Sequence, residues 1–145
     1  MAVSASTEFD VKAPPALVME VLLDVESLPD WSGPHKSAKI VTTDDEGRPL
    51  RVDLSVSAVG MTDHQSLDYS WTDNTCAWEL VQSDQLSLQQ GVYTLSEKAD
   101  GTTHVKFDLT IDLKIKLPGL IVKRAQKMAV DTAKKGLTDE VKRRS

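Results

Sequence analysis

Residues 104–132 have the sequence HVKFDLTIDLKIKLPGLIVKRAQKMAVDT, which contains the clearest structural signals of the chain. Up to residue 115, apolar and polar residues alternate strictly, which predicts a β-strand with one buried face. After Pro118-Gly119 the apolar period lengthens to about 3.6 residues, which predicts an amphipathic helix. The apolar stripe of that helix consists of Ile121, Ala125, Met128 and Thr132.

The residues before this stretch predict six more strands and two short helices. Residues 3–11 alternate like the last strand, and Pro15 favours the first turn of a short helix over 16–23. A second short helix is expected over 24–31, ending at Pro29. Further strands, separated by turns, are predicted within 35–43, 50–58, 61–71, 76–80 and 86–96.

These elements predict an α+β fold in a single domain, residues 1–145. Seven antiparallel strands with one apolar face and one long amphipathic helix can bury those faces together if the sheet curves around the helix. Gly136 interrupts the helical stripe, so we expect a kink or a loosened turn there.

The composition is that of a globular protein, with 40% hydrophobic and 27% charged residues. A net charge of −5 argues against nonspecific binding to nucleic acid. Cys76 is the single cysteine and is expected to be a small buried hydrophobe, with no disulfide or cysteine zinc site. No apolar run reaches the roughly 18 residues of a spanning helix, and residues 1–6 lack a secretory pattern. We expect a cytoplasmic protein, with a monomer favoured.

Charge is divided unevenly along the chain. Residues 1–113 carry 7 Lys and Arg against 19 Asp and Glu, whereas residues 114–145 carry 10 against 3. Within the basic part, the segment Leu117–Arg124 combines apolar residues and cations where the long helix begins. Two interpretations stay open: a solvated helix face beside an acidic sheet, or weak peripheral contact with an anionic membrane.

Four short motifs carry a resemblance to a known family. They are Ala13-Pro14-Pro15 after the first strand, the segment 24–31, Gly101-Thr102 before the last strand, and Leu117-Pro118-Gly119 before the long helix. With them the chain resembles, over essentially its whole length, the polyketide cyclase/dehydrase branch of the START-like superfamily, also called SRPBCC or Bet v 1-like. The resemblance implies a helix-grip fold with a hydrophobic cavity between sheet and helix.

The resemblance also implies a function class. We expect binding, transport or sequestration of a small hydrophobic or amphipathic molecule such as a lipid, quinone or polyketide, with no cofactor. Fold alone does not determine function, so two alternatives stay open. One is an enzyme of the cyclase, aromatase or dehydratase kind, and the other is a protein-interaction module similar to ribosome-associated or chaperone-activating relatives.

Candidate cavity residues are apolar or aromatic side chains at positions that can face inward. They are Trp31, Met61, Tyr69, Trp71, Trp78, Phe107, Leu117, Ile121 and Met128. Aromatic rings and methionines suit a ligand cavity, but they fill ordinary cores equally well.

Three polar residues, Asp63, Gln65 and Gln90, share strand parity with apolar neighbours. If they face inward they need partners, since an unpaired buried polar group costs roughly 1–3 kcal/mol, and a ligand could be such a partner. Alternatively, a bulge near Gly60 or Gly91 turns them outward. Asp63 is the weak candidate for a catalytic general base.

The three histidines, His35, His64 and His104, are scattered along the chain, and no metal site is expected from them.

Overall fold

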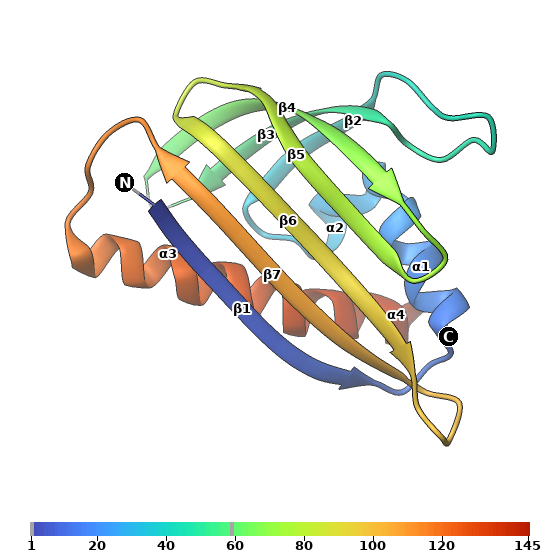
Figure 1. Cartoon of the computed structure of the whole chain (residues 1–145). Coiled ribbons are helices and arrows are strands. Elements are labelled where there is room, and N and C mark those ends of the chain that lie inside the picture. The colour runs from blue at the N-terminus through green and yellow to red at the C-terminus, as the bar shows by residue number, and fades with distance from the viewer. Residues whose placement is uncertain (1, 59) are drawn as a thin grey trace.

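A seven-stranded antiparallel sheet in the order β1-β7-β6-β5-β4-β3-β2 forms one layer of the protein (Figure 1). The structure is a computed structural model that describes residues 2–58 and 60–145. The strands are β1 (Ala2–Val11), β2 (His35–Ile40), β3 (Arg51–Ala58), β4 (Met61–Trp71), β5 (Thr75–Ser83), β6 (Leu86–Glu97) and β7 (Thr103–Leu113). From β2 to β7 successive strands pair with each other, and β1 pairs with β7.

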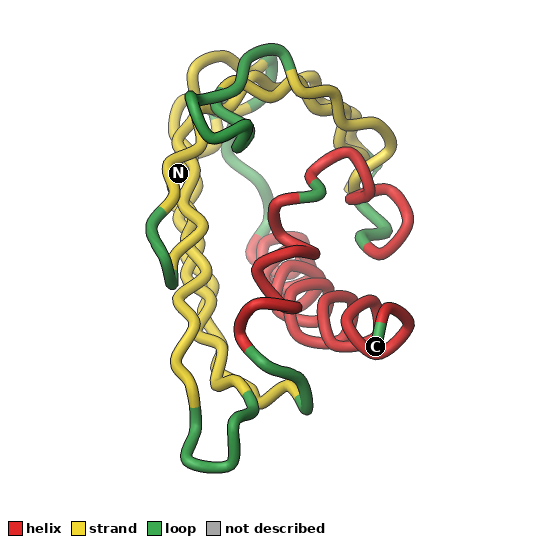
Figure 2. The backbone as a smooth tube through the Cα atoms, turned by 90° about the vertical axis from the view of Figure 1, so that its right-hand side faces the viewer, coloured by secondary structure: helices red, strands yellow, loops and turns green. Residues whose placement is uncertain are grey.

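The helices form the second layer, on the concave side of the curved sheet (Figure 2). They are α1 (Pro15–Leu23), η1 (Val25–Ser27), α2 (Leu28–Trp31), α3 (Gly119–Asp131), η2 (Thr132–Gly136) and α4 (Leu137–Arg144). The predicted fold, a sheet curved around a long C-terminal helix with two short helices after the first strand, is confirmed.

The buried faces follow the alternation of the sequence. In β7, Val105 and Phe107 are buried while Lys106 between them is exposed. In β4 the buried residues include Asp63 and Gln65, so the predicted parity of that strand is confirmed and neither residue is turned outward.

The second short helix differs from the prediction in the role of its proline. Pro29 lies in the first turn of α2 rather than at its end. Proline lacks a backbone N–H and has a φ suited to the first turn, so it starts a helix more readily than it ends one.

The C-terminal helix is interrupted by the π-helical turn η2, which ends at Gly136. The loosened turn expected at this glycine is therefore confirmed. A Cβ at position 136 would lie 2.5 Å from the backbone oxygen of Trp31. Only glycine lets the helix approach α2 so closely.

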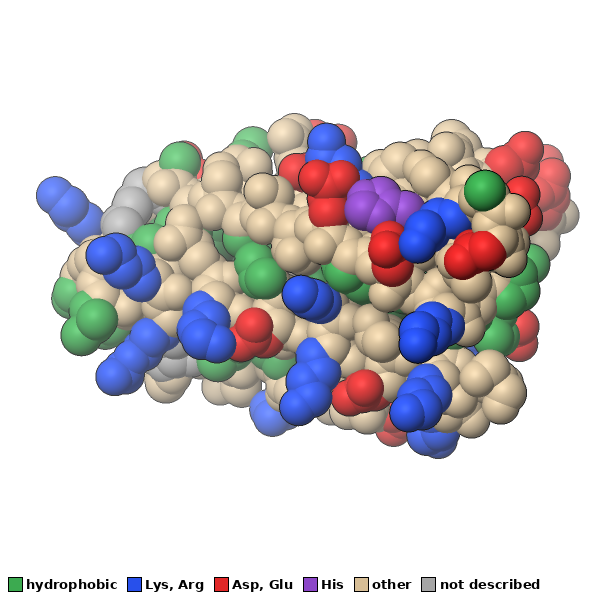
Figure 3. Space-filling view, turned by 90° about the horizontal axis from the view of Figure 1, so that it is seen from below, with side chains coloured by type: hydrophobic (Ala, Val, Ile, Leu, Met, Phe, Trp, Pro, Cys, Tyr) green, Lys and Arg blue, Asp and Glu red, His purple; other side chains and the backbone are tan. Residues whose placement is uncertain are grey.

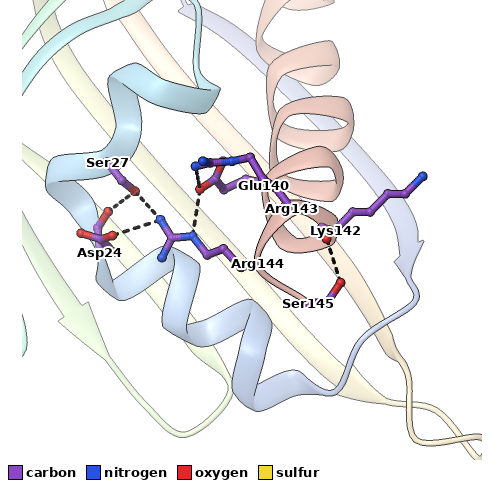
Figure 4. A network of polar contacts seen from close by, with 7 residues as sticks. All are labelled: Asp24, Ser27, Glu140, Lys142, Arg143, Arg144 and Ser145. Atoms are coloured by element: carbon purple, nitrogen blue, oxygen red, sulfur yellow. Dashed lines mark hydrogen bonds and ion pairs between the residues drawn. The ribbon is translucent and has the colours of Figure 1, made fainter.

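Arg144 connects the end of α4 to the segment after α1 through hydrogen bonds and ion pairs (Figure 4). Its guanidinium donates to the carboxylates of Glu140 (2.8 Å) and Asp24 (3.0 Å) and to the hydroxyl of Ser27 (3.1 Å). Arg143 also pairs with Glu140, whose side chain is only 3% exposed, and the two arginines lower the pKa of that carboxyl. These contacts hold the end of the C-terminal helix against the segment after α1.

Candidate functional site

A cavity of about 260 Å³ lies between the concave face of the sheet and α3. Its lining is mostly apolar and, among the described residues, includes no Lys, Arg or Glu. The central strands contribute Leu67, Tyr69, Trp78, Tyr93, Phe107 and Leu109, and the C-terminal helix contributes Val122, Ala125, Met128, Ala129, Thr132 and Ala133.

Four rings from β4 to β7 form a continuous aromatic wall on the sheet side. The ring centroids of Tyr69 and Trp78 are 5.9 Å apart, those of Trp78 and Tyr93 5.7 Å, and those of Tyr93 and Phe107 5.0 Å. Tilted contacts at such distances are favourable between aromatic rings and hold each ring in place. The aromatic wall therefore offers a fixed apolar surface to any ring that enters the cavity.

The two tyrosine hydroxyls of this wall are free to bind a ligand. Burial raises the pKa of Tyr69 and Tyr93 far above the usual value, so both stay protonated and can donate a hydrogen bond. Among the described residues, neither hydroxyl has a hydrogen-bond partner.

A chain of hydrogen bonds leads from the aromatic wall to a buried carboxylate. The indole Nε1 of Trp78 donates to Oε1 of Gln89 at 2.9 Å. Nε2 of Gln89 donates to Oε1 of Gln65 at 3.0 Å, and Nε2 of Gln65 donates to Oδ2 of Asp63 at 2.9 Å. Every donor points toward Asp63, so each amide oxygen already accepts one bond and each amide keeps one further N–H.

Asp63 itself is fully engaged. Besides Gln65, its carboxylate accepts bonds from the Ser83 hydroxyl at 2.6 Å and from the backbone N–H groups of Asp84 (3.0 Å) and Gln85 (3.1 Å). Four donors match the acceptor sites of an ionised carboxylate. Asp63 thus anchors the turn between β5 and β6, and the expectation of a free general base at this position finds no support in the geometry.

The end of the cavity beside α2 holds three further polar groups. Nδ1 of His35 lies 2.5 Å from the hydroxyl of Ser32, and burial lowers the pKa of His35 to about 4, so the ring is neutral near pH 7. The indole Nε1 of Trp31 is buried and has no hydrogen-bond partner among the described residues. A buried donor left unpaired is costly, which makes this N–H a place where a ligand oxygen would be stabilised.

Most of the predicted cavity residues line the cavity. They are Trp31, Met61, Asp63, Gln65, Tyr69, Trp78, Phe107, Leu117 and Met128. Their contact with a ligand stays a prediction.

Gln90, a predicted cavity residue, does not line the cavity, and of the two facings left open for it the outward one holds. The register of β6 shifts between Leu86 and Leu88, which reverses the facing of the residues that follow. As a result Gln90 is exposed, and Gln89 points inward in its place.

Trp71 and Ile121 also lie outside the lining. The indole Nε1 of Trp71 donates to the backbone oxygen of Pro49 at 2.6 Å, and its ring stacks on Tyr69 with centroids 5.5 Å apart. At the start of α3, Val122 lines the cavity instead of Ile121. Residues three and four positions before Ala125 can both share its helical face, so the sequence pattern alone did not distinguish them.

Tyr93, Gln89 and His35 also line the cavity, although their positions in the sequence did not indicate it. Tyr93 and Gln89 come after the register shift between Leu86 and Leu88 in β6. Predicting which residues of this strand face the cavity would therefore have required knowing where the shift lies. His35 is the first residue of β2, where no alternation precedes it, so nothing in the local pattern indicates its facing.

The described residues contain no group of three His, Cys, Asp or Glu side chains that could hold a metal ion. Within the same residues, no helix has the length and apolarity needed to cross a bilayer.

A family model described as "Polyketide cyclase / dehydrase and lipid transport" matches residues 11–138. The chain belongs to this family. The resemblance found in the sequence is thereby confirmed, and members of this START- and Bet v 1-like group typically bind hydrophobic ligands. No protein of curated function matches the chain in sequence.

Solved structures share the fold over nearly the whole chain. A START superfamily protein from Mycobacterium smegmatis is 21% identical, with a TM-score of 0.87 over 98% of this chain and 99% of its own. A protein from Thermus thermophilus is 24% identical, with a TM-score of 0.81 over 98% and 99%. The Zhui aromatase/cyclase from Streptomyces sp. R1128 is 18% identical, with a TM-score of 0.73 over 99% and 96%. At these identities the likeness concerns the fold alone.

Proposed function

We propose that the cavity binds one small, uncharged molecule that carries aromatic or fused rings and a carbonyl or similar acceptor oxygen, and that the protein carries or sequesters it. The observation that carries this proposal is a fixed aromatic wall together with unpaired hydrogen-bond donors among the described lining residues. These donors include the hydroxyls of Tyr69 and Tyr93 and the indole N–H of Trp31.

The size of the cavity supports a ligand of this kind. A cavity of roughly 150 Å³ admits a single benzene, and this one measures about 260 Å³. It therefore has room for more than one ring, but it is slightly smaller than drug-sized ligand pockets, which measure roughly 300–1,000 Å³.

The charges around the cavity favour an uncharged ligand. A bound carboxylate or phosphate would lose its hydration without gaining a cation, because no Lys or Arg of the described chain lines the cavity. A bound ammonium would find only Asp63 among the described lining residues, and that carboxylate already accepts four hydrogen bonds. A neutral molecule avoids both costs.

The enzyme alternative is less well supported. A cyclase or dehydratase needs an acid or base in contact with the ligand. Asp63 is engaged with its four donors, and the neutral His35 has a pKa of about 4, which makes it a weak base near pH 7. No specific observation favours the protein-interaction alternative.

Three ligands of the same shape test the proposal. The probes are 2-acetylnaphthalene, 2-isopropylnaphthalene and 2-naphthoate, which place a carbonyl, a hydrocarbon and a carboxylate on one ring system. We expect micromolar binding of the ketone by ligand-observed NMR, binding of the hydrocarbon weaker by roughly fivefold, as expected for one lost hydrogen bond, and the weakest binding for the carboxylate. If none of the three binds, or if the carboxylate binds best, the proposal is wrong.

A further inference from the structure

The first turn of α3 exposes a large apolar side chain beside unpaired cations. Leu120 is 67% exposed, and Lys123 and Arg124 follow it at the spacing that places residues on one helical face. Among the described residues, neither cation has an ion-pair or hydrogen-bond partner. The preceding loop adds Ile115, which is 49% exposed, and Lys116. We call these five residues the basic apolar patch.

The same segment also closes the cavity. Leu117 lies in the loop between Ile115 and Leu120 and lines the cavity, as does Val122 near the start of α3. A partner that engages Leu120 would therefore touch the outer side of a cavity wall.

Figure 3 shows how charge is arranged around this segment. Lys and Arg side chains are spread over the face seen there, with hydrophobic side chains and a smaller number of Asp and Glu between them. The chain before residue 114 carries 19 acidic against 7 basic residues, whereas the remainder carries 3 against 10. An anionic surface would attract the basic C-terminal part of the chain and repel the acidic remainder, which favours one orientation.

We propose that the basic apolar patch docks the protein peripherally on an anionic lipid bilayer, with Leu120 and Ile115 entering the interface and the cations meeting lipid headgroups. Basic residues close to an anionic membrane are attracted electrostatically, and apolar side chains that insert beside them add hydrophobic binding. Two exposed apolar side chains are too few for the core of a stable protein interface, but they suit shallow, reversible insertion. The net negative charge of the rest of the chain keeps this binding weak and sensitive to salt.

Vesicle flotation tests this proposal without any cavity ligand, so its outcome is independent of the proposed function. We expect the protein to float with vesicles of phosphatidylcholine and phosphatidylserine at low salt. It should remain at the bottom with pure phosphatidylcholine and should largely dissociate at physiological salt, where the Debye length falls to about 8 Å.

Variants locate the contact. The charge reversal Lys123→Glu with Arg124→Glu should weaken binding at least about tenfold, and Leu120→Ser should weaken it several-fold. The matched control is Lys39→Glu with Lys106→Glu, which makes the same change in net charge at exposed positions of β2 and β7. It should retain most of the binding, and melting curves check that each variant folds.

Three outcomes would overturn the proposal. They are wild-type protein that stays at the bottom with anionic vesicles at low salt, equal flotation with neutral vesicles, and a control variant that loses as much binding as the Lys123 and Arg124 variant.

Discussion

The backbone of Gly91 lies against the indole of Trp78, its partner across β5 and β6, and leaves no room for a side chain. A Cβ at position 91 would overlap ring carbons Cε2 and Cζ2 of the indole. The same indole donates through Nε1 to Gln89, the first step of the hydrogen-bond chain that ends at Asp63. Gly91 therefore permits both the aromatic wall and the polar chain.

Gly91→Ala should lower the free energy of unfolding by about 1–3 kcal/mol, the usual cost of overpacking. The added methyl must displace the indole and strain its bond to Gln89. Urea denaturation and the near-ultraviolet circular dichroism of the tryptophans are the measurements.

Gly33→Ala is the matched control, since a Cβ at that position meets no atom within 4 Å. It should change stability by less than about 0.5 kcal/mol. Equal losses for the two variants would show that the contact with Trp78 is not the cause.

Asp63→Asn tests whether this carboxylate is an anchor. The variant should lose about 1–3 kcal/mol of stability, because an amide offers one acceptor oxygen where four donors converge. Asp68→Asn, on the same strand, should cost less than about 1 kcal/mol, because its ion pair with Arg51 is exposed. If Asp63→Asn were as stable as the wild type, the anchoring role would be excluded.

His35 should make the protein less stable in mild acid. Burial lowers its folded-state pKa from 6.5 to about 4. As the pH falls below 6.5, the unfolded chain takes up a proton that the folded protein refuses, so stability decreases. We expect a loss of roughly 1.5 kcal/mol between about pH 6.5 and about pH 5, measured by urea denaturation at each pH.

Two variants isolate this effect. His35→Asn should flatten the pH dependence in that window. His104→Asn should leave it intact, because Glu8 and Asp10 raise the pKa of His104, and its contribution is lost only as the pH rises through that higher value. If His35→Asn leaves the pH dependence of the free energy of unfolding unchanged, another group titrates in this window.

The sequence predicted the fold well because the signals that determine it are periodic. Alternation in β7 and the change of period after Pro118-Gly119 are long patterns that survive local irregularity. In β4 the alternation allowed Asp63 and Gln65 to face inward or, after a bulge, outward, and the inward alternative holds because no register shift precedes them on that strand.

The site was predicted less completely because one shifted residue in β6 changes the facing of the rest. Gln90 was a candidate cavity residue with its facing left open, whereas Gln89 and Tyr93 are the residues that line the cavity. The backbone of the preceding turn is held by Asp63, which is distant in sequence, and by Ser83, whose residue type alone specifies no register. Such tertiary contacts leave no local pattern.

Recognition through Tyr69 and Tyr93 is tested by removing their two hydroxyls without changing the shape of the cavity. In Tyr69→Phe with Tyr93→Phe the rings and their packing are kept. We expect affinity for 2-acetylnaphthalene to fall by about 5- to 30-fold, as one or two lost hydrogen bonds predict, while affinity for 2-isopropylnaphthalene is unchanged. Trp71→Phe, outside the lining, should leave the ketone's affinity as in the wild type. If the double variant binds the ketone as tightly as the wild type, recognition through the two tyrosine hydroxyls is contradicted.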